Sequence, residues 1–97
     1  MHIISRKPLR EFSAKHPPAK NPLDMWFVEV SHTTWANFSD VKATYGSADG
    51  VADNRVIFNI GGNKYRLVVK IAYKTGKVFV RFVGTHAEYN KIDAKTI

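Results

Sequence analysis

The sequence of 97 residues contains no cysteine, and its four histidines are scattered along the chain. Disulfide bonds and thiolate metal sites are therefore excluded, and no spacing typical of a zinc site is present. No apolar run approaches the roughly 18 residues of a membrane-spanning helix, and no secretory signal pattern is found at the N-terminus. We expect one soluble, cytoplasmic domain over residues 1–97, with no structural metal and no cofactor, because so short a chain forms one small core.

Acidic residues are missing from a stretch of 34 residues, 54–87, which carries seven lysines and arginines. On both sides of this stretch the positive and negative charges cancel, so it holds the whole net charge of +7. A patch of one sign on a small domain is typical of a protein that binds a polyanion. One alternative is a surface that serves only solubility, although such surfaces usually mix both signs. Another is binding to anionic membranes, for which the sequence lacks an amphipathic basic helix.

The N-terminal half predicts a strand followed by two helices. The adjacent isoleucines of MHII favour a short strand inside a sheet, and Pro8 suits the start of a helix that must end before the Pro-Pro pair. Asn21 is a candidate cap for the second helix, in which apolar residues recur at i, i+3, i+4 and i+7. The four residues of this stripe are Leu23, Trp26, Phe27 and Val30.

Residues 33–54 give weaker signals. They predict one or two further turns of helix, with Ser39 or Asp40 as a cap. The remainder, from Gly46 onward, is rich in small and polar residues and predicts a surface connection.

Residues 55–83 carry the strongest strand signals and predict a three-stranded antiparallel meander. Apolar and polar side chains alternate in three segments, which are joined by the turn sequences GGN and KTGK. One face, with Phe82 among its members, is assigned to the helices. The other face would present a shallow basic trough that contains Asn59, Arg66, Lys70 and Arg81. The predicted fold class is α+β, with the N-terminal strand and two helices packed on a small antiparallel sheet.

Groups that can bind phosphate or move protons stand where this trough would end. Arginine offers a planar fork of donors that matches two phosphate oxygens, so Arg66 and Arg81 are candidate phosphate ligands. An unperturbed imidazole has a pKa of about 6.5, so His86 can exchange protons near neutrality, and Tyr89 can donate or accept through its hydroxyl. Ordinary exposed charge and simple packing are the alternative interpretations. Taken together, the four side chains resemble a metal-independent ribonuclease site.

The segments VIFNIGGNKYRLVVKIAY (56–73) and VRFVGTHAEYNKID (80–93) resemble the HigB branch of the RelE-like toxins. The resemblance lies in the pattern FNxGGN, then YRL, then THxEY. It implies two helices against an antiparallel sheet and the toxin of a type II toxin-antitoxin system, a ribosome-dependent mRNA endoribonuclease. The implied partners are mRNA on the ribosome and a small helix-turn-helix antitoxin like HigA.

Carried over to this sequence, the resemblance gives Arg66, His86 and Tyr89 as the catalytic group. The RNA-binding candidates are Asn59, Asn63, Lys64, Lys70, Arg81 and Lys91, and no residue is expected to bind metal. The expected reaction is attack of the substrate's own 2′-hydroxyl on the adjacent phosphorus, with the order of acid and base left open. The alternative function is a non-catalytic RNA or ribosome binder that blocks translation through the same trough.

Overall fold

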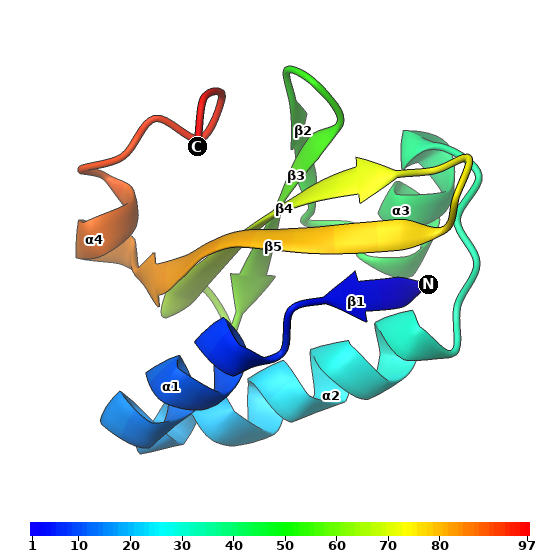
Figure 1. The fold of residues 1–97 in the computed structure, drawn as a ribbon. Coiled ribbons are helices and arrows are strands. Elements are labelled where there is room, and N and C mark those ends of the chain that lie inside the picture. The colour runs from blue at the N-terminus through cyan, green and yellow to red at the C-terminus, as the bar shows by residue number, and fades with distance from the viewer.

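A computed structural model describes all 97 residues, as helices and a sheet in an α+β arrangement (Figure 1). The elements follow one another as β1 (His2–Ile4), α1 (Lys7–Lys15), a 3-10 turn (Pro17–Ala19), α2 (Lys20–Ser31), α3 (Phe38–Thr44), β2 (Asp49–Val51), β3 (Arg55–Ile60), β4 (Tyr65–Ala72), β5 (Lys77–Thr85) and α4 (His86–Tyr89). The longest helix, α2, has 12 residues, and no helix meets the length and apolarity that crossing a membrane requires.

The five strands form one mixed sheet in the order β1-β5-β4-β3-β2. The predicted meander is confirmed, because β3, β4 and β5 pair antiparallel in sequence order. Three successive positive φ angles, at Gly61, Gly62 and Asn63, make the turn between β3 and β4, which suits two residues without a Cβ. The short strand β1 pairs parallel with β5 and lies at the edge of the sheet, so the prediction of an inner strand is wrong.

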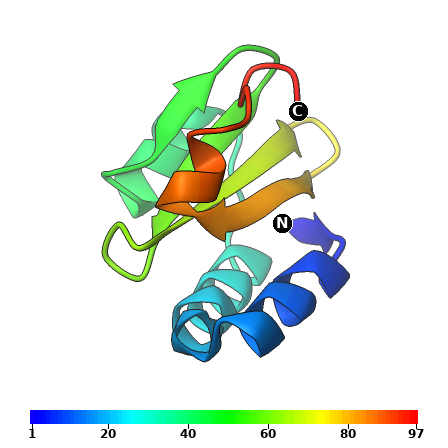
Figure 2. The same ribbon diagram turned by 90° about the vertical axis from the view of Figure 1, so that its left-hand side faces the viewer.

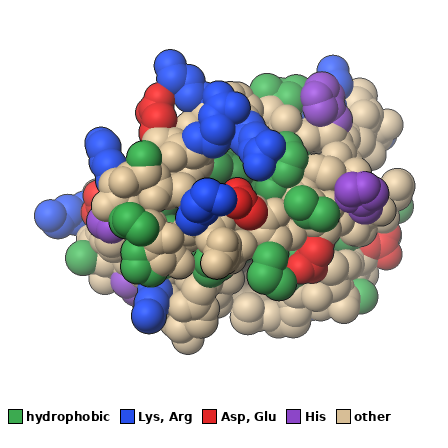
Figure 3. All heavy atoms as spheres, turned by 90° about the horizontal axis from the view of Figure 1, so that it is seen from below, with side chains coloured by type: hydrophobic (Ala, Val, Ile, Leu, Met, Phe, Trp, Pro, Cys, Tyr) green, Lys and Arg blue, Asp and Glu red, His purple; other side chains and the backbone are tan.

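Helices α1 and α2 lie side by side under one face of the sheet, and the main core fills the space between the layers (Figures 1 and 2). The predicted apolar stripe of α2 is confirmed: Leu23, Trp26 and Val30 are buried, and Phe27 is half-buried against the same core. On the solvent side of the two helices, lysines and arginines alternate with acidic and apolar side chains (Figure 3). The helical face therefore mixes both signs of charge.

The helix starts differ from those predicted. Helix α2 begins at Lys20, directly after the 3-10 turn, so Asn21 already lies inside the helix and does not cap it. Helix α3 is capped by Asn37, whose side chain accepts from the backbone N–H of Asp40 at 3.1 Å, and not by Ser39 or Asp40. Helix α2 has no side-chain cap, because Ala19 before it is itself in the helical region, whereas Asn37 before α3 takes the extended conformation that a capping residue needs.

A β-bulge in β5 reverses the alternation of side chains near its end. Val80 pairs with Val69 and Phe82 pairs with Val68, which leaves Arg81 as the extra residue. Beyond the bulge, Phe82 therefore lies on the face away from α1 and α2, where it joins a small apolar cluster with Ile57 and Val68. The prediction that Phe82 faces the helices is wrong for this reason.

Candidate active site

Three polar side chains from two elements converge where β5 passes into α4. Arg66, on β4, donates a hydrogen bond from Nη2 to Nε2 of His86, the first residue of α4, at 3.0 Å. The guanidinium carbon of Arg66 lies 4.9 Å from the centroid of the Tyr89 ring, and the His86 and Tyr89 ring centroids are 6.5 Å apart. All three residues are half-buried. The structure therefore brings together the three side chains predicted to form the catalytic group.

The hydrogen bond between Arg66 and His86 fixes the position of the imidazole proton. A guanidinium group can only donate, so Nε2 of His86 is the acceptor and the ring proton is on Nδ1. The imidazole is neutral in this arrangement. Nε of Arg66 is buried without a hydrogen-bond partner, so the guanidinium keeps donor capacity that the free protein does not use.

Helix α4 is a single turn whose start is stabilised by a capping box. The Thr85 hydroxyl accepts from the backbone N–H of Glu88 at 3.2 Å, and the Glu88 carboxylate accepts from the backbone N–H of Thr85 at 2.8 Å. His86 and Tyr89 are three residues apart, so they share the side of the helix that faces Arg66. The capping box therefore holds both candidate proton-transfer groups in place.

The capping interaction also shows in the pKa of Glu88. This pKa is lowered, mainly because the carboxylate accepts the Thr85 N–H, and also because it lies near the positive charges of His16 and Lys15. Partial desolvation opposes the shift. The ionised carboxylate is the form that holds the start of α4.

Gly84, just before α4, leaves room for a neighbouring ring. It pairs with Arg66 across the ladder, and a Cβ placed on it would lie 2.5 Å from Cζ of Phe82 and 3.1 Å from Oε1 of Glu88. Any larger residue would have to displace Phe82 or the capping carboxylate. Glycine at this position thus lets the Phe82 ring and the capping carboxylate of Glu88 approach β5 closely.

Four of the predicted RNA-binding residues surround this group. Asn59 is the cross-strand partner of Arg66; its Nδ2 donates to Ser47 O at 3.4 Å, and its Oδ1 is buried without a partner. Asn63 and Lys64 are exposed in the turn between β3 and β4, next to Tyr65, which pairs with Thr85. Lys91 is exposed just after α4. Cationic and amide side chains therefore lie on two sides of the Arg66 group.

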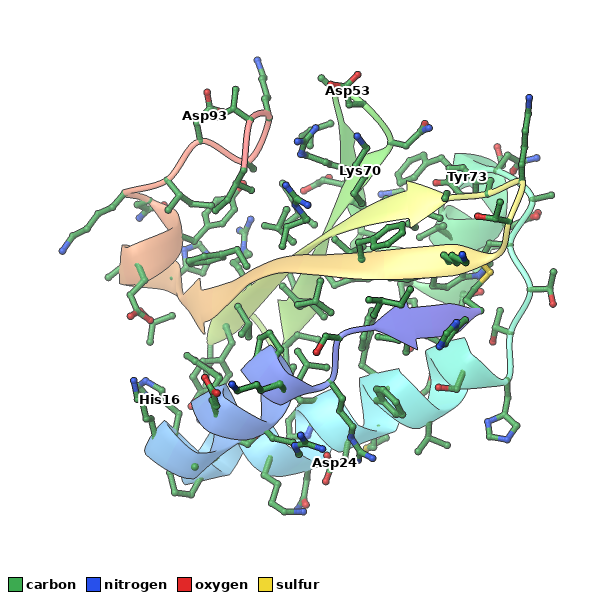
Figure 4. All side chains as sticks on the ribbon, in the orientation of Figure 1. His16, Asp24, Asp53, Lys70, Tyr73 and Asp93 are labelled. Atoms are coloured by element: carbon green, nitrogen blue, oxygen red, sulfur yellow. The ribbon has the colours of Figure 1, made fainter.

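Lys70 and Arg81, in contrast, lie apart from this group. Lys70 is four residues from Arg66 along β4, about 13 Å for an extended strand, and Figure 4 shows it near Asp53. An apolar cluster of Ile57, Val68 and Phe82 lies between Arg66 and Lys70. It is covered by apolar side chains of the C-terminal segment (residues 90–97), namely Ile92, Ala94 and Ile97. The predicted continuous basic trough is wrong, because the apolar middle of this face is covered.

Two arginines anchor the C-terminal segment. The main-chain oxygen of Ile97 accepts from Nε of Arg55 at 2.8 Å and from Nε of Arg81 at 3.3 Å. Arg55 is 7% exposed and also pairs with Asp53 at 3.5 Å. Two of the seven cations in the basic stretch therefore hold the chain's own C-terminal segment, although Arg81 is exposed and keeps part of its guanidinium free.

Sequence reasoning missed Gly84, Phe82 and the capping pair of Thr85 and Glu88. The capping box has a visible signal, since Thr-His-Ala-Glu fits the pattern of Ser or Thr followed three residues later by Glu. The bulge has no comparable signal, because the alternation of apolar residues continues through it unbroken. Strand periodicity alone could therefore not place Phe82.

Comparison with known proteins identifies the relatives of this chain. Residues 19–92 match the HigB toxin family, described as the RelE-like toxic component of a toxin-antitoxin system. The "mRNA interferase toxin HigB" of Escherichia coli K12 is 30% identical over 92 residues, which cover 93% of this chain and 88% of the relative. The "mRNA interferase HigB" of Escherichia coli O6:H1 (strain CFT073) is 26% identical over 94 residues, or 95% of this chain and 91% of the relative.

Proposed function

This chain belongs to the HigB family of toxins, the RelE-like toxic component of a toxin-antitoxin system, and from that premise we propose that it is an mRNA interferase. It cleaves mRNA as an endoribonuclease on translating ribosomes in the cytoplasm and so stops protein synthesis. The observation that carries the proposal is the contact of Arg66 with both His86 and Tyr89. One phosphate-binding group and two proton-transfer groups lie within reach of one phosphodiester linkage.

The proposed reaction needs no metal ion. The 2′-hydroxyl of the substrate gives its proton to Nε2 of His86, and its oxygen attacks the adjacent phosphorus. The bond from phosphorus to the 5′-oxygen breaks, and the leaving oxygen takes a proton from the Tyr89 hydroxyl. The products are a 2′,3′-cyclic phosphate and a 5′-hydroxyl. The neutral imidazole, with its lone pair on Nε2, supports His86 as the base.

Arg66 supplies the charge that this reaction needs. Its guanidinium is placed by His86 on one side and by the Tyr89 ring on the other, so little rearrangement is needed when phosphate binds. Negative charge grows on the phosphoryl oxygens in the transition state, and a fixed guanidinium stabilises it. A small shift of the guanidinium moves the Nη2 donor from His86 to a phosphoryl oxygen, and Nε2 of His86 is then free to take the proton.

The surrounding residues bind the RNA strand. Asn59, Asn63, Lys64 and Lys91 flank the catalytic group and contact the substrate directly. Lys70 and Arg81, beyond the C-terminal segment, add longer-range attraction for the polyanion. The antitoxin is a small HigA-like helix-turn-helix protein, whose acidic or partly disordered segments suit this basic surface.

A binder without catalytic activity is the competing function. It would use the same cations to block RNA or the ribosome, and the basic excess of residues 54–87 supports both functions equally. The proximity of His86 and Tyr89 to Arg66 favours cleavage, because a binder has no use for two proton-transfer groups beside its phosphate ligand.

Brief expression in cells, followed by mapping of mRNA 5′ ends, separates the two functions. Cleavage produces new ends inside translated codons, and the ends disappear when ribosomes are cleared from the message beforehand. A binder arrests growth without new ends, and this result would overturn the proposal. New ends on untranslated RNA at an undiminished rate would overturn the dependence on ribosomes alone.

A further inference from the structure

A second hollow lies on the other side of α4 from the catalytic group. Its volume is about 290 Å³, and it runs between α1 and the end of β5. It is lined from three elements: Pro8, Glu11, Phe12, Lys15 and the C-cap His16 from α1, Val83 from β5, and Glu88 from α4. Figure 4 shows His16 at the end of α1, on the same side of the molecule as α4. Apart from Glu88, which caps α4, none of these side chains has a role in the proposed cleavage.

One wall of this hollow is a fixed aromatic plane. The His16 ring stacks on Phe12 with a centroid distance of 4.4 Å and an interplanar angle of 29°. Phe12 is buried and meets Tyr65 edge to face at 5.4 Å, which fixes the pair in position. His16 is only half-buried, so part of its ring faces the hollow. Nucleic-acid bases stack on such planes whatever their sequence.

The opposite wall offers a fixed acceptor. Oε1 of Glu88 accepts from the backbone N–H of Thr85 at 2.8 Å, and the Thr85 side chain also helps to lower the pKa of the carboxyl, whereas Oε2 is left without a backbone donor. The capping box holds this second oxygen in one place, and carboxylates accept from the exocyclic amine of cytosine. Lys15 adds an exposed cation beside the hollow, suited to a phosphate.

The two sites are close enough to share one strand of RNA. His86 and Glu88 are two residues apart on a single turn of helix and face opposite sides of it. A strand cut beside His86 therefore reaches the hollow within one or two nucleotides by crossing the start of α4.

We propose that this hollow is a base-binding subsite for the RNA substrate, which takes a base with an exocyclic amine. The base stacks on His16, its amine donates to Oε2 of Glu88, and Lys15 pairs with a neighbouring phosphate. The subsite rests on the proposed function, because its nucleotide belongs to the strand that is cut beside His86. It gives the enzyme a sequence preference that the catalytic group alone does not provide.

Short RNAs in which every 2′-hydroxyl is methylated test the subsite, since they bind but lack the attacking group. Hexamers of cytidine and of uridine are compared, because the two bases differ in the 4-amine and the 4-oxygen. The cytidine hexamer is expected to bind roughly 2- to 10-fold more tightly, the range of one hydrogen bond. Equal binding of the two hexamers overturns the subsite.

Substitution of Glu88→Gln tests the acceptor itself. The glutamine oxygen keeps the cap on Thr85, while its amide N–H₂ replaces the free acceptor and donates to the 4-oxygen of uracil. The preference for cytidine should disappear or reverse. An undiminished preference for cytidine in this variant shows that Glu88 does not read the base.

Substitution of His16→Ala tests the stacking plane and should weaken binding of both hexamers. His16→Phe keeps an aromatic ring and should restore it. His32→Ala is the matched control. His32 is the C-cap residue of α2, as His16 is of α1, but it is exposed and does not line the hollow. If His16→Ala binds both hexamers as tightly as His32→Ala, the subsite is overturned.

Cleavage assays on the same preparations keep the two proposals apart. If the protein cuts unmethylated mRNA on ribosomes without preferring cytidine over uridine, the subsite is overturned and the proposed nuclease activity is supported. If the protein prefers the cytidine hexamer through His16 and Glu88 but cuts no mRNA, the base-binding subsite is supported and the proposed nuclease activity is overturned.

Discussion

At the scale of single residues, the account depends on the two contacts of Arg66. Its guanidinium meets an imidazole on one side and a phenol ring on the other. The sequence indicated these three residues through residue chemistry and the THxEY pattern, but alternation along β4 could not show that Arg66 reaches α4. That contact depends on α4, a single turn that the capping box of Thr85 and Glu88 fixes directly after β5.

Tyr89→Phe separates the two roles of the tyrosine. The ring that stacks on Arg66 is retained, so the fold and RNA binding should persist. Loss of the hydroxyl removes the proton donor and should slow cleavage about 10²- to 10⁴-fold. Single-turnover cleavage of mRNA on ribosomes, with circular dichroism as the folding control, measures the effect. A rate within twofold of the unsubstituted protein would identify Tyr89 as a packing residue.

At the scale of elements, the least predictable feature is the bulge in β5. Period-two alternation predicted the faces of β3 and β4 correctly, because those strands pair without interruption. One extra residue at Arg81 was enough to move Phe82 to the other face, and this invalidated the predicted trough. The single turn of α4 was predictable in principle, since its capping box is readable in the sequence.

The capping box should make the order of α4 depend on pH. The lowered pKa of Glu88 means that its carboxylate stabilises the folded state above the pKa of the unfolded chain. This contribution is lost as the pH falls through the lower, folded pKa. The protection of the Thr85 N–H against amide exchange, measured relative to its intrinsic exchange rate at each pH, should therefore fall in acid, and Glu88→Gln should remove this dependence while keeping the hydrogen bond. An acid transition of the same size in Glu88→Gln would contradict the assignment.

At the scale of the whole molecule, the sheet has two differently used faces. One is buried under α1 and α2 (Figures 1 and 2). On the other face, the C-terminal segment covers the apolar cluster of Ile57, Val68 and Phe82, which separates Arg66 from Lys70. Charge counting along the chain located the basic excess but not this division. The cover formed by residues 90–97 was not predictable, because it depends on contacts between distant segments, such as Ile97 with Arg55.

The division of the basic face predicts unequal salt effects for two lysines. Lys64→Ala removes a cation beside the catalytic group, and it should reduce the slope of log affinity against log salt by about 0.7 on single-stranded RNA. Lys70 lies beyond the C-terminal segment, so Lys70→Ala should reduce this slope by less. Fluorescence anisotropy with a 2′-methylated RNA at several salt concentrations measures both slopes. Equal reductions would show that one continuous surface binds the strand.

The chemistry of the RNA ends tests the catalytic group most directly. The purified protein, His86→Gln and Arg66→Ala are each given mRNA on translating ribosomes, and the new 3′ ends are analysed for a 2′,3′-cyclic phosphate. The analysis is then repeated after the enzyme and the ribosomes have been treated with a chelator that removes transition metals but spares magnesium. This repeat tests whether cleavage is independent of transition metals. The unsubstituted protein should give cyclic phosphate ends, and both variants should be folded and give none. Undiminished cleavage by both variants, or products that end in a 3′-hydroxyl, would contradict the account.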